Sequence, residues 1–194
     1  MNIIEIPEDW RGRAIVVAET AIPLAWFTEE ELRAAEGFRL ARRREEFLLS
    51  RAAAKKLAID LGAAEDVAAI RIEHRRIGAM HLSISHSAPY AAAAIDATPI
   101  GIDIQVVRSI RESAAHLFLS EEESAAMQGC GVPDRLIHFW CAKEAAWKRR
   151  GGEVETLKRV PIVLEEEVPL GLRFDAVDTR RIGDVVVALT RPTS

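Results

Sequence analysis

The sequence has too few cysteines for a disulfide framework or a zinc site. Cys130 and Cys141 are the only two, they form no CxxC motif, and no cluster of histidine and cysteine has the spacing of zinc ligands. Cysteines of this kind remain free thiols in a reducing compartment. The pattern therefore favours two free thiols.

The sequence also lacks a long apolar run and a large charge of either sign. No stretch approaches the roughly 20 apolar residues that cross a bilayer, and the first residues, MNIIEIPEDWRGR, lack the apolar segment of a signal peptide. The formal charge of −4 argues against wholesale nucleic-acid binding. We expect a cytoplasmic protein that binds neither nucleic acid nor membrane.

Basic residues are clustered despite the negative net charge. They gather in RLARRREEFLLSRAAAKK (39–56) and KRRGG (148–152). Local basic patches on an acidic protein suit a phosphorylated small molecule or an acidic partner protein.

One part of the sequence occurs twice. TEEE (28–31) has the pattern of a capping box, in which a hydroxyl and a glutamate three residues later cap a helix, and SEEE (120–123) repeats it 92 residues on. At the same offset, FLLSRAAAKK (47–56) aligns with FWCAKEAAWK (139–148), and Phe, two Ala and Lys are identical. Two matches at one offset without a gap indicate an internal duplication.

Each half has the same order of predicted elements. A short β-branched strand (14–19 and 99–107) precedes a capped helix and a longer helix, and further strands close each half. We predict an α+β fold of two similar, pseudo-twofold-related lobes, residues 1–97 and 98–194. Each lobe is expected to be a small, mostly antiparallel sheet packed with a long helix. Clefts between lobes are common ligand sites.

The two copies differ at two acidic positions. Ala52 in the first long helix becomes Glu144 in the second, and a neutral position in AIVV (14–17) becomes Asp103. Acids that occur in only one copy indicate chemistry rather than a contribution to stability.

The helix predicted for 139–148 mixes charged and aromatic residues on one face. At about 3.6 residues per turn, Trp140, Lys143, Glu144, Trp147 and Lys148 share one side, with alanines behind. An ordinary amphipathic helix separates such residues. Glu144 is either a desolvated working group or part of a surface pair with Lys148 worth roughly 0.3–0.5 kcal/mol.

The strand GIDIQ (101–105) carries two oxygen-bearing side chains on one face. Strand alternation places Asp103 and Gln105 together, opposite two isoleucines. With Glu144 from the helix, these residues offer oxygen ligands of the kind that Mg²⁺ accepts. An edge strand with a solvated polar face explains the pattern equally well.

The stretch LSISHSAP (82–89) ends a strand in a Ser-His-Ser turn. Hydroxyls, a histidine and free backbone N–H groups at a strand end can hold a phosphate. A Ser-His hydrolase dyad is the competing interpretation, but there is no G-x-S-x-G motif, and Ser85 and His86 would point to opposite faces. A histidine with its hydrogen bonds satisfied in the turn also remains open.

Basic residues form a stripe on the first long helix. Arg44, Arg51 and Lys55 share a face with Leu48. Such a stripe is most often solvated, and the alternative is a site for phosphate or adenine contacts. The sequence contains no P-loop and no G-x-G-x-x-G motif.

The run SISHSAPYAAAAIDATPIGIDIQVV (83–107), followed by FWCAKEAAWK (139–148), resembles the motifs of the 4′-phosphopantetheinyl transferases. The family pattern is S-H-S, then G-[IV]-D-[IV]-E, then W-[ST]-x-K-E-A-x-x-K. The sequence is most similar to the surfactin-synthetase-activating type, a single chain of two pseudo-symmetric halves. The resemblance implies transfer of the phosphopantetheine arm of coenzyme A to a serine of an apo carrier protein, with Mg²⁺ or Mn²⁺ and release of 3′,5′-ADP.

The resemblance also implies roles for individual residues. Asp103 and Glu144 would hold the metal, with Gln105 in the place of a third acid. Lys148 would stabilise the leaving 3′,5′-ADP, and Glu144 would be the base for the carrier serine.

The coenzyme A contacts that the resemblance implies are shared between the halves. Ser85 and His86 would bind phosphates, Lys143 would be a further basic contact, and Arg44 and Arg51 are candidates for the 3′-phosphate. The first half would contribute to coenzyme A binding, the second would carry the metal site and the catalytic helix, and together they would form one catalytic unit.

Three features depart from the family pattern. Gln105 replaces an acid, so that two carboxylates would hold the metal and the amide would ligate weakly or through water. HRRIGAM (74–80) stands where members often have Gly-Lys-Pro, with Arg75 or Arg76 as substitutes. TEEEL (28–32) is acidic where basic residues are common.

A non-catalytic relative that binds coenzyme A or a carrier protein and has a regulatory role is the alternative function. Gln105 is the feature that favours it, whereas the retained acids and lysines of the motifs favour the enzyme. Duplication within one chain predicts a monomer. Fatty-acid, polyketide and peptide-synthetase carriers all remain open as partners.

Overall fold

The computed structural model describes residues 1–108 and 111–192 and divides the chain into two compact units. The first is Met1–Pro99 and the second is Ile100–Ser194. None of the described helices has the length and apolarity needed to cross a membrane.

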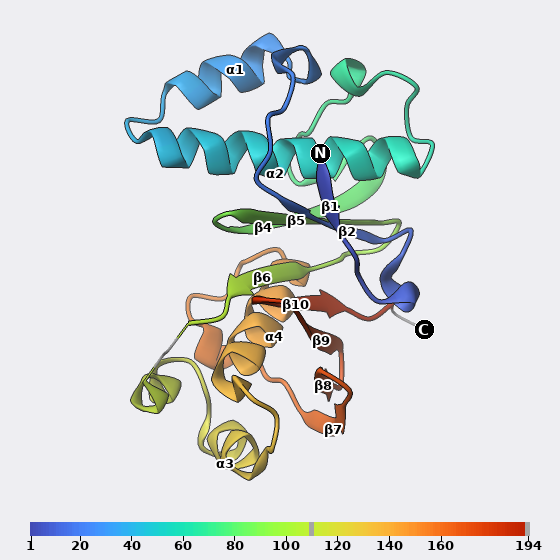
Figure 1. The fold of residues 1–194 in the computed structure, drawn as a ribbon. Helices are drawn as coiled ribbons and strands as arrows, with labels where there is room; N and C mark the ends of the chain where they lie inside the picture. Colours follow the sequence, from blue (N-terminus) through green and yellow to red (C-terminus); the bar gives the residue numbers. More distant parts are fainter. Residues whose placement is uncertain (109–110, 193–194) are drawn as a thin grey trace. The chain divides into compact units, whose positions relative to one another are not determined.

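The first unit is an antiparallel sheet with a long helix packed on one face (Figure 1). The strand order is β1-β2-β5-β4-β3, and the shorter helix α1 packs on α2. Its elements are β1 (Asn2–Ile4), β2 (Ala14–Ala18), α1 (Glu29–Glu36), α2 (Ala41–Asp60), β3 (Arg76–Ile77), β4 (Met80–Ser87) and β5 (Tyr90–Asp96), with 3-10 turns η1 (Glu8–Trp10), η2 (Leu24–Trp26) and η3 (Val67–Ala69).

The core of the first unit lies between α2 and the sheet. Ile15 and Val17 alternate out of β2 into this core, beside alanines of β5 that are completely buried. Small residues on the sheet let the helix approach closely. Leu49 and Leu57 fill the space from the helix side.

The second unit has the same plan. Its strand order is β6-β10-β9-β8-β7, and α4 packs on β6, β9 and β10. Its elements are β6 (Ile102–Val106), η4 (Glu112–Leu117), α3 (Glu121–Gly129), α4 (Arg135–Arg149), η5 (Leu157–Arg159), β7 (Leu164–Val168), β8 (Gly171–Phe174), β9 (Val177–Ile182) and β10 (Val185–Thr190).

Four strands correspond between the two sheets. The order β2-β5-β4-β3 in the first unit matches β6-β10-β9-β8 in the second, and all neighbours are antiparallel. The fifth strand lies at opposite ends, since β1 extends the sheet beside β2 and β7 extends it beside β8. The predicted α+β fold of two similar lobes is confirmed.

Both predicted capping boxes are present. Thr28 and Glu31 cap α1 reciprocally, and Ser120 and Glu123 do the same for α3. In each unit the capping glutamate also forms an ion pair with a buried lysine of the long helix. Lys55 Nζ lies 2.7 Å from Glu31 Oε2, and Lys143 forms the corresponding pair with Glu123. Each pair ties a short helix to the long one.

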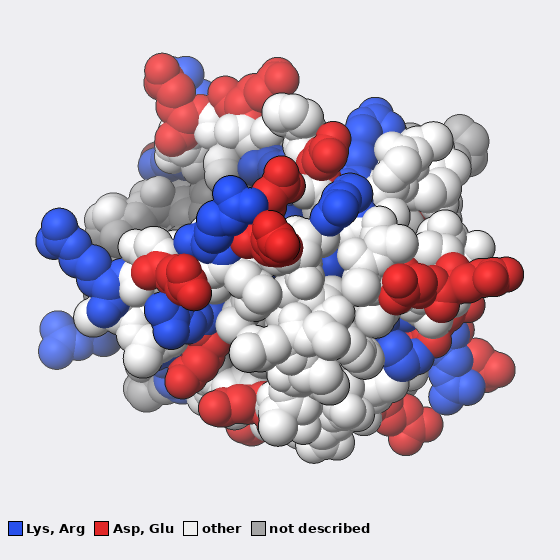
Figure 2. All heavy atoms as spheres, turned by 90° about the horizontal axis from the view of Figure 1, so that it is seen from above, with Lys and Arg blue, Asp and Glu red and all other residues white. Residues whose placement is uncertain are grey.

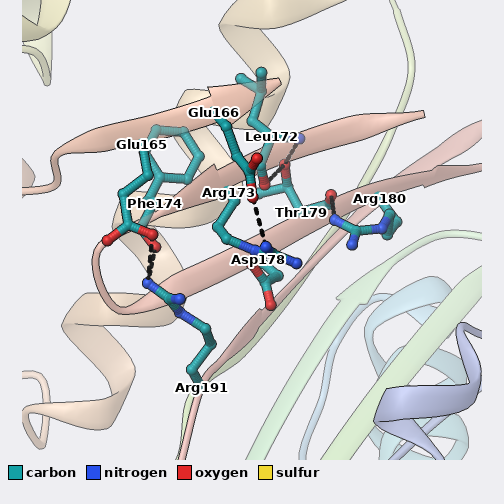
Figure 3. A network of polar contacts seen from close by, with 9 residues as sticks. All are labelled: Glu165, Glu166, Leu172, Arg173, Phe174, Asp178, Thr179, Arg180 and Arg191. Atoms are coloured by element: carbon teal, nitrogen blue, oxygen red, sulfur yellow. Dashed lines mark hydrogen bonds and ion pairs between the residues drawn. The ribbon is translucent and has the colours of Figure 1, made fainter. Parts of the chain in front are cut away.

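The edge of the second sheet is fixed by ion pairs (Figure 3). Arg173 of β8 binds Glu166 of β7 and Asp178 of β9, with its Nε 3.1 Å from Asp178 Oδ1. Arg191, just after β10, lies 2.9 Å from Glu165 Oε2. The acidic strand β7 is therefore held by arginines from the rest of the sheet.

Candidate active site

The strand β6 presents a buried carboxylate to the helix α4. Asp103 is only 5% exposed, and it pairs in register with Ala188 of β10, which lies in the core under the helix. Ile102 and Ile104 point to the other face of the sheet and are also buried. The alternation predicted for this strand is therefore present, and the alternative of a solvated polar face is excluded for Asp103.

Gly101 allows the helix to approach the start of β6. A Cβ atom at this position would lie 1.9 Å from the carbonyl oxygen of Ala145 and 3.0 Å from the amide nitrogen of Arg149. Any other residue would collide with the helix backbone. The glycine of the GID motif thus sets the separation between Asp103 and the side chains of α4.

Two helical residues complete a charged cluster around Asp103. Lys148 Nζ lies 2.6 Å from Asp103 Oδ1 and 3.1 Å from the carbonyl oxygen of Ile102. Glu144, one turn earlier on α4, is half-buried. Its pKa is raised by burial and by the nearby Asp103 charge, and Lys148 offsets part of this effect. The structure therefore brings together the three residues predicted to be catalytic.

Cys141 also belongs to this cluster, although it was not among the predicted site residues. Its thiol is fully buried, and its pKa is raised well above the usual value by burial and by Asp103 at hydrogen-bonding distance. The helical spacing of Cys141, Glu144 and Lys148 places all three on one side, and this spacing was the available signal. The thiol donates a hydrogen bond to the carbonyl oxygen of Val186, with 3.7 Å between Sγ and O.

Gln105, two residues after Asp103 on β6, lines a small apolar pocket. The pocket has a volume of about 200 Å³ and is lined by Gln105, Arg108, Leu117, Phe118 and Trp140, among others. Phe118 and Trp140 form its wall with an edge-to-face contact, 5.0 Å between ring centroids. Gln105 therefore shares the face of Asp103, as predicted.

Lys143 does not join the charged cluster. Its side chain is completely buried against α3 in the ion pair with Glu123, whose other oxygen accepts the amide N–H of Ile162. Burial lowers the pKa of Lys143, and Glu123 offsets part of that effect. The mixed face predicted for the helix is thus divided between two environments.

In the first unit, Ser85 and His86 point to opposite faces of β4, since they are adjacent strand residues. Ser85 is buried, whereas His86 is exposed beside α2. His86 Nε2 lies 3.3 Å from Glu46 Oε2 and 3.4 Å from Arg43 Nη1. This geometry excludes a Ser85–His86 dyad.

The arginine beside His86 is not one of the predicted ones. Arg42 and Arg43 both form ion pairs with the buried Glu46, with N–O distances of 2.8 and 3.1 Å, and Arg43 Nη1 also lies 3.4 Å from His86 Nε2. The spacing of three and four residues to Glu46 was the signal for them.

The two predicted arginines are engaged elsewhere. Arg44 Nε donates to the carbonyl oxygen of Ala35. Arg51 stacks over the Phe47 ring at 4.8 Å and bonds the carbonyl oxygen of Ile72. Burial lowers the pKa of Arg51. Neither arginine contacts His86 within the described residues.

Comparison with known proteins found a family match for the part of the chain that carries the charged cluster. The sequence model of the 4′-phosphopantetheinyl transferase superfamily matches residues 99–182. The chain is therefore similar to that superfamily over 84 of its 194 residues. The resemblance of the motifs is thereby confirmed.

Curated relatives are bacterial 4′-phosphopantetheinyl transferases. The chain is 31% identical over 80 residues to 4′-phosphopantetheinyl transferase psf-1 of Bacillus pumilus, covering 40% of this chain and 34% of the relative. It is 35% identical over 74 residues to 4′-phosphopantetheinyl transferase Sfp of Bacillus subtilis, covering 37% of this chain and 33% of the relative. The matched stretch thus spans about a third of each relative's length.

The superfamily match separates the predicted site residues into two groups. Asp103, Gln105, Lys143, Glu144 and Lys148 lie within it. Ser85 and His86, like the arginines of α2, lie before it. The assignment of coenzyme A to these earlier residues stays a prediction.

Proposed function

We propose that the protein transfers 4′-phosphopantetheine from coenzyme A to a serine of an apo carrier protein and releases 3′,5′-ADP. The observation that carries this proposal is the cluster of Asp103, Glu144 and Lys148 in the part of the chain that the transferase superfamily model matches. We further propose that the protein acts as a monomer in the cytoplasm, with Mg²⁺.

The cluster has the chemistry of a divalent-cation site. Asp103 is buried and Glu144 is half-buried, and the charge of Asp103 raises the pKa of Glu144, so a cation between the two carboxylates would relieve this repulsion. Gln105 adds a neutral oxygen on the same face. Among residues 1–108 and 111–192, no group of three His, Cys, Asp or Glu side chains forms a metal site. Two carboxylates and an amide suit Mg²⁺, which keeps water ligands and binds phosphate oxygens.

The protein groups supply acid–base and electrostatic catalysis. In the transfer, the serine oxygen forms a bond to the β-phosphorus of the pyrophosphate, and the bond from that phosphorus to the oxygen of 3′,5′-ADP breaks. Glu144 takes the serine proton, because its raised pKa makes it a better base than an exposed glutamate. Lys148 offsets the negative charge that develops on the leaving group. Bound Mg²⁺ would supply further charge neutralisation on the pyrophosphate.

The coenzyme A contacts are proposed on the first unit. His86 and the adjacent Arg43 offer an exposed donor pair for a phosphate, and Ser85 is a further candidate. Arg44 and Arg51 remain candidates for the 3′-phosphate. Lys143 would have to leave its buried pair with Glu123 to contact coenzyme A.

The alternative is a relative that binds coenzyme A or a carrier protein without turnover. Gln105 is the feature that supports it, since a third carboxylate is missing from the cluster. The pairing of Lys148 with Asp103 beside Glu144 supports the enzyme, because a binding protein has no need of a general base.

The deciding experiment is the intact mass of apo carrier proteins of the fatty-acid, polyketide and peptide-synthetase classes after incubation with the protein, coenzyme A and Mg²⁺. We expect a mass increase of one phosphopantetheine that disappears without metal and with Glu144→Ala. Glu153→Ala removes an exposed acid after α4 and serves as the matched control.

Each other outcome has a definite meaning. Full transfer by Glu144→Ala would refute the role of Glu144. Absence of transfer to every carrier class, with coenzyme A binding retained, would establish the non-catalytic alternative.

A further inference from the structure

The first unit contains a cavity that the proposed transfer does not use. It has a volume of about 730 Å³, within the range of small-molecule sites. Four segments enclose it: the chain after β2, the residue before the α1 cap, the first half of α2, and the turn between β4 and β5. Its lining includes Glu19, Ala21, Phe27, Glu45, Leu48 and Tyr90.

This cavity and the pocket beside Gln105 share one equivalent lining position on the long helices. Leu48 lines the cavity where Trp140 lines the other pocket, at the offset of the duplication. Both pockets also include residues just after the leading strand, Thr20 in one and Arg108 in the other.

The walls of the cavity are mainly apolar. Phe27 and Leu49 are buried within it, and alanines, an isoleucine and a proline complete the lining. When an apolar ligand body enters the cavity, its own apolar surface and that of the walls are removed from water, which favours binding.

The charge at the rim is negative. Arg42 lines the cavity but is bound to Glu46, which also accepts from Arg43. Glu19 and Glu45 are exposed, and among the described residues their carboxylates have neither an ion pair nor a hydrogen bond. Figure 2, which views the molecule from the side of α1 and α2, shows acidic and basic residues interspersed rather than one basic field. Glu19 and Glu45, the two lining acids without an ion pair in the described part of the chain, therefore favour a positively charged ligand in the cavity.

We propose that this cavity is a second ligand site, and that it takes a cationic amphiphile with an apolar body and one amine or guanidinium group. The apolar body contacts Phe27, Leu48 and Leu49, and the cation lies between Glu19 and Glu45. The site is distinct from the charged cluster of the second unit and does not depend on the transfer reaction.

Two probe molecules of opposite charge test whether the cavity prefers a cationic ligand. The amine 2-(naphthalen-1-yl)ethylamine and the acid naphthalene-1-acetic acid share an apolar ring and differ in charge. We expect the amine alone to bind the full chain, measured by calorimetry and by the NMR shifts of the Ala21 and Tyr90 amides. Equal or tighter binding of the acid, or no binding of the amine at millimolar concentration, would overturn the proposal.

Variants test the location. Glu19→Gln combined with Glu45→Gln should weaken amine binding about tenfold, since each exposed charge contributes up to about 1 kcal/mol. Glu36→Gln, an exposed acid of α1 outside the lining, should leave the affinity unchanged. Ala21→Trp should place an indole in the cavity and weaken amine binding by obstruction, and unchanged binding would contradict the assignment.

Coenzyme A provides the last arm of the test, because the turn after His86 contributes to the cavity wall. We expect no competition between coenzyme A and the amine. Displacement of the amine by coenzyme A would assign the cavity to the nucleotide and overturn the proposal.

Discussion

The two units of the molecule share the same arrangement of sheet and helix and differ in the residue type at two equivalent positions. Ile15 pairs with Ala93 in the first sheet, and Asp103 pairs with Ala188 in the second, each alanine being the fourth residue of its strand. On the long helices, Ala52 corresponds to Glu144. The first unit is apolar at both positions, whereas the second brings two carboxylates together.

The comparison separates a pair that stabilises both units from the residues that we propose to carry the chemistry. The capping glutamate and its buried lysine occur in both units, so this pair belongs to the scaffold. The carboxylates of the cluster occur once and are not required for the fold, because the first unit forms the same sheet and helix without them.

The strongest test makes the second unit resemble the first. We expect the double variant Asp103→Ile with Glu144→Ala to lose transfer by at least about a thousandfold, because it removes the base and both proposed metal ligands. Its free energy of unfolding should fall by no more than about 3 kcal/mol, because Lys148 loses its partner Asp103 but is partly exposed and can reach water. Intact-mass and urea-unfolding measurements check both statements. Unfolding of the variant would show that the carboxylates are also structural.

Breaking the shared lysine pair should affect both units alike. Lys143→Met and Lys55→Met each leave a capping glutamate buried without its cation, at an expected cost of about 3–5 kcal/mol. Chemical denaturation measures this cost, and Lys158→Met, on η5, is the control. A small effect in one unit only would show that the pair is not an equivalent part of both scaffolds.

Acid should weaken the second unit before the first. His138 is fully buried in α4, and its pKa is lowered to about 4 by burial and by the charges of Arg181 and Arg180. In the unfolded chain this histidine takes up a proton near pH 6.5, whereas in the folded chain it does so only near pH 4. The free energy of unfolding is therefore highest above pH 6.5 and falls as the pH drops toward 4. The loss approaches about 3 kcal/mol.

The equivalent position in the first unit is Glu46, and its behaviour should differ. Burial alone would raise its pKa, but the hydrogen bond from Arg42 and the charges of His86 and the arginines lower it below the usual 4.5. The contribution of Glu46 to the free energy of unfolding is therefore present above pH 4.5 and is lost only below pH 4.5. Unfolding followed between pH 6.5 and 4.5 should show a slope that His138→Gln removes. A slope that persists in this variant would assign it to another group.

The smallest expected change concerns metal affinity. Gln105→Glu should tighten Mg²⁺ binding by about tenfold, since it restores a third carboxylate to the cluster. Gln105→Val, which copies Val17 of the first unit, should not tighten it. Calorimetric titration with Mg²⁺ measures both. An unchanged affinity in Gln105→Glu would place this side chain outside the metal site.

Local sequence signals were sufficient for the elements and for most of the cluster. The capping boxes, the strand alternation at Asp103 and the helical spacing of Glu144 and Lys148 depend only on neighbours along the chain. These features were predicted, and the structure contains them. The repeated segment likewise indicated two similar halves, because an internal duplication repeats its local patterns.

Only the tertiary structure decided the partners of the charged side chains. Lys143 and Lys148 both follow the periodicity of one helix, yet one is buried against α3 and the other binds a strand. In the first unit, Glu46 selects Arg42 and Arg43 in place of Arg44. The sequence by itself determined which residues are available, because periodicity and caps are local. Which of them meet was decided by packing, since burial gives an ion pair its partner and its pKa only after distant segments have come together.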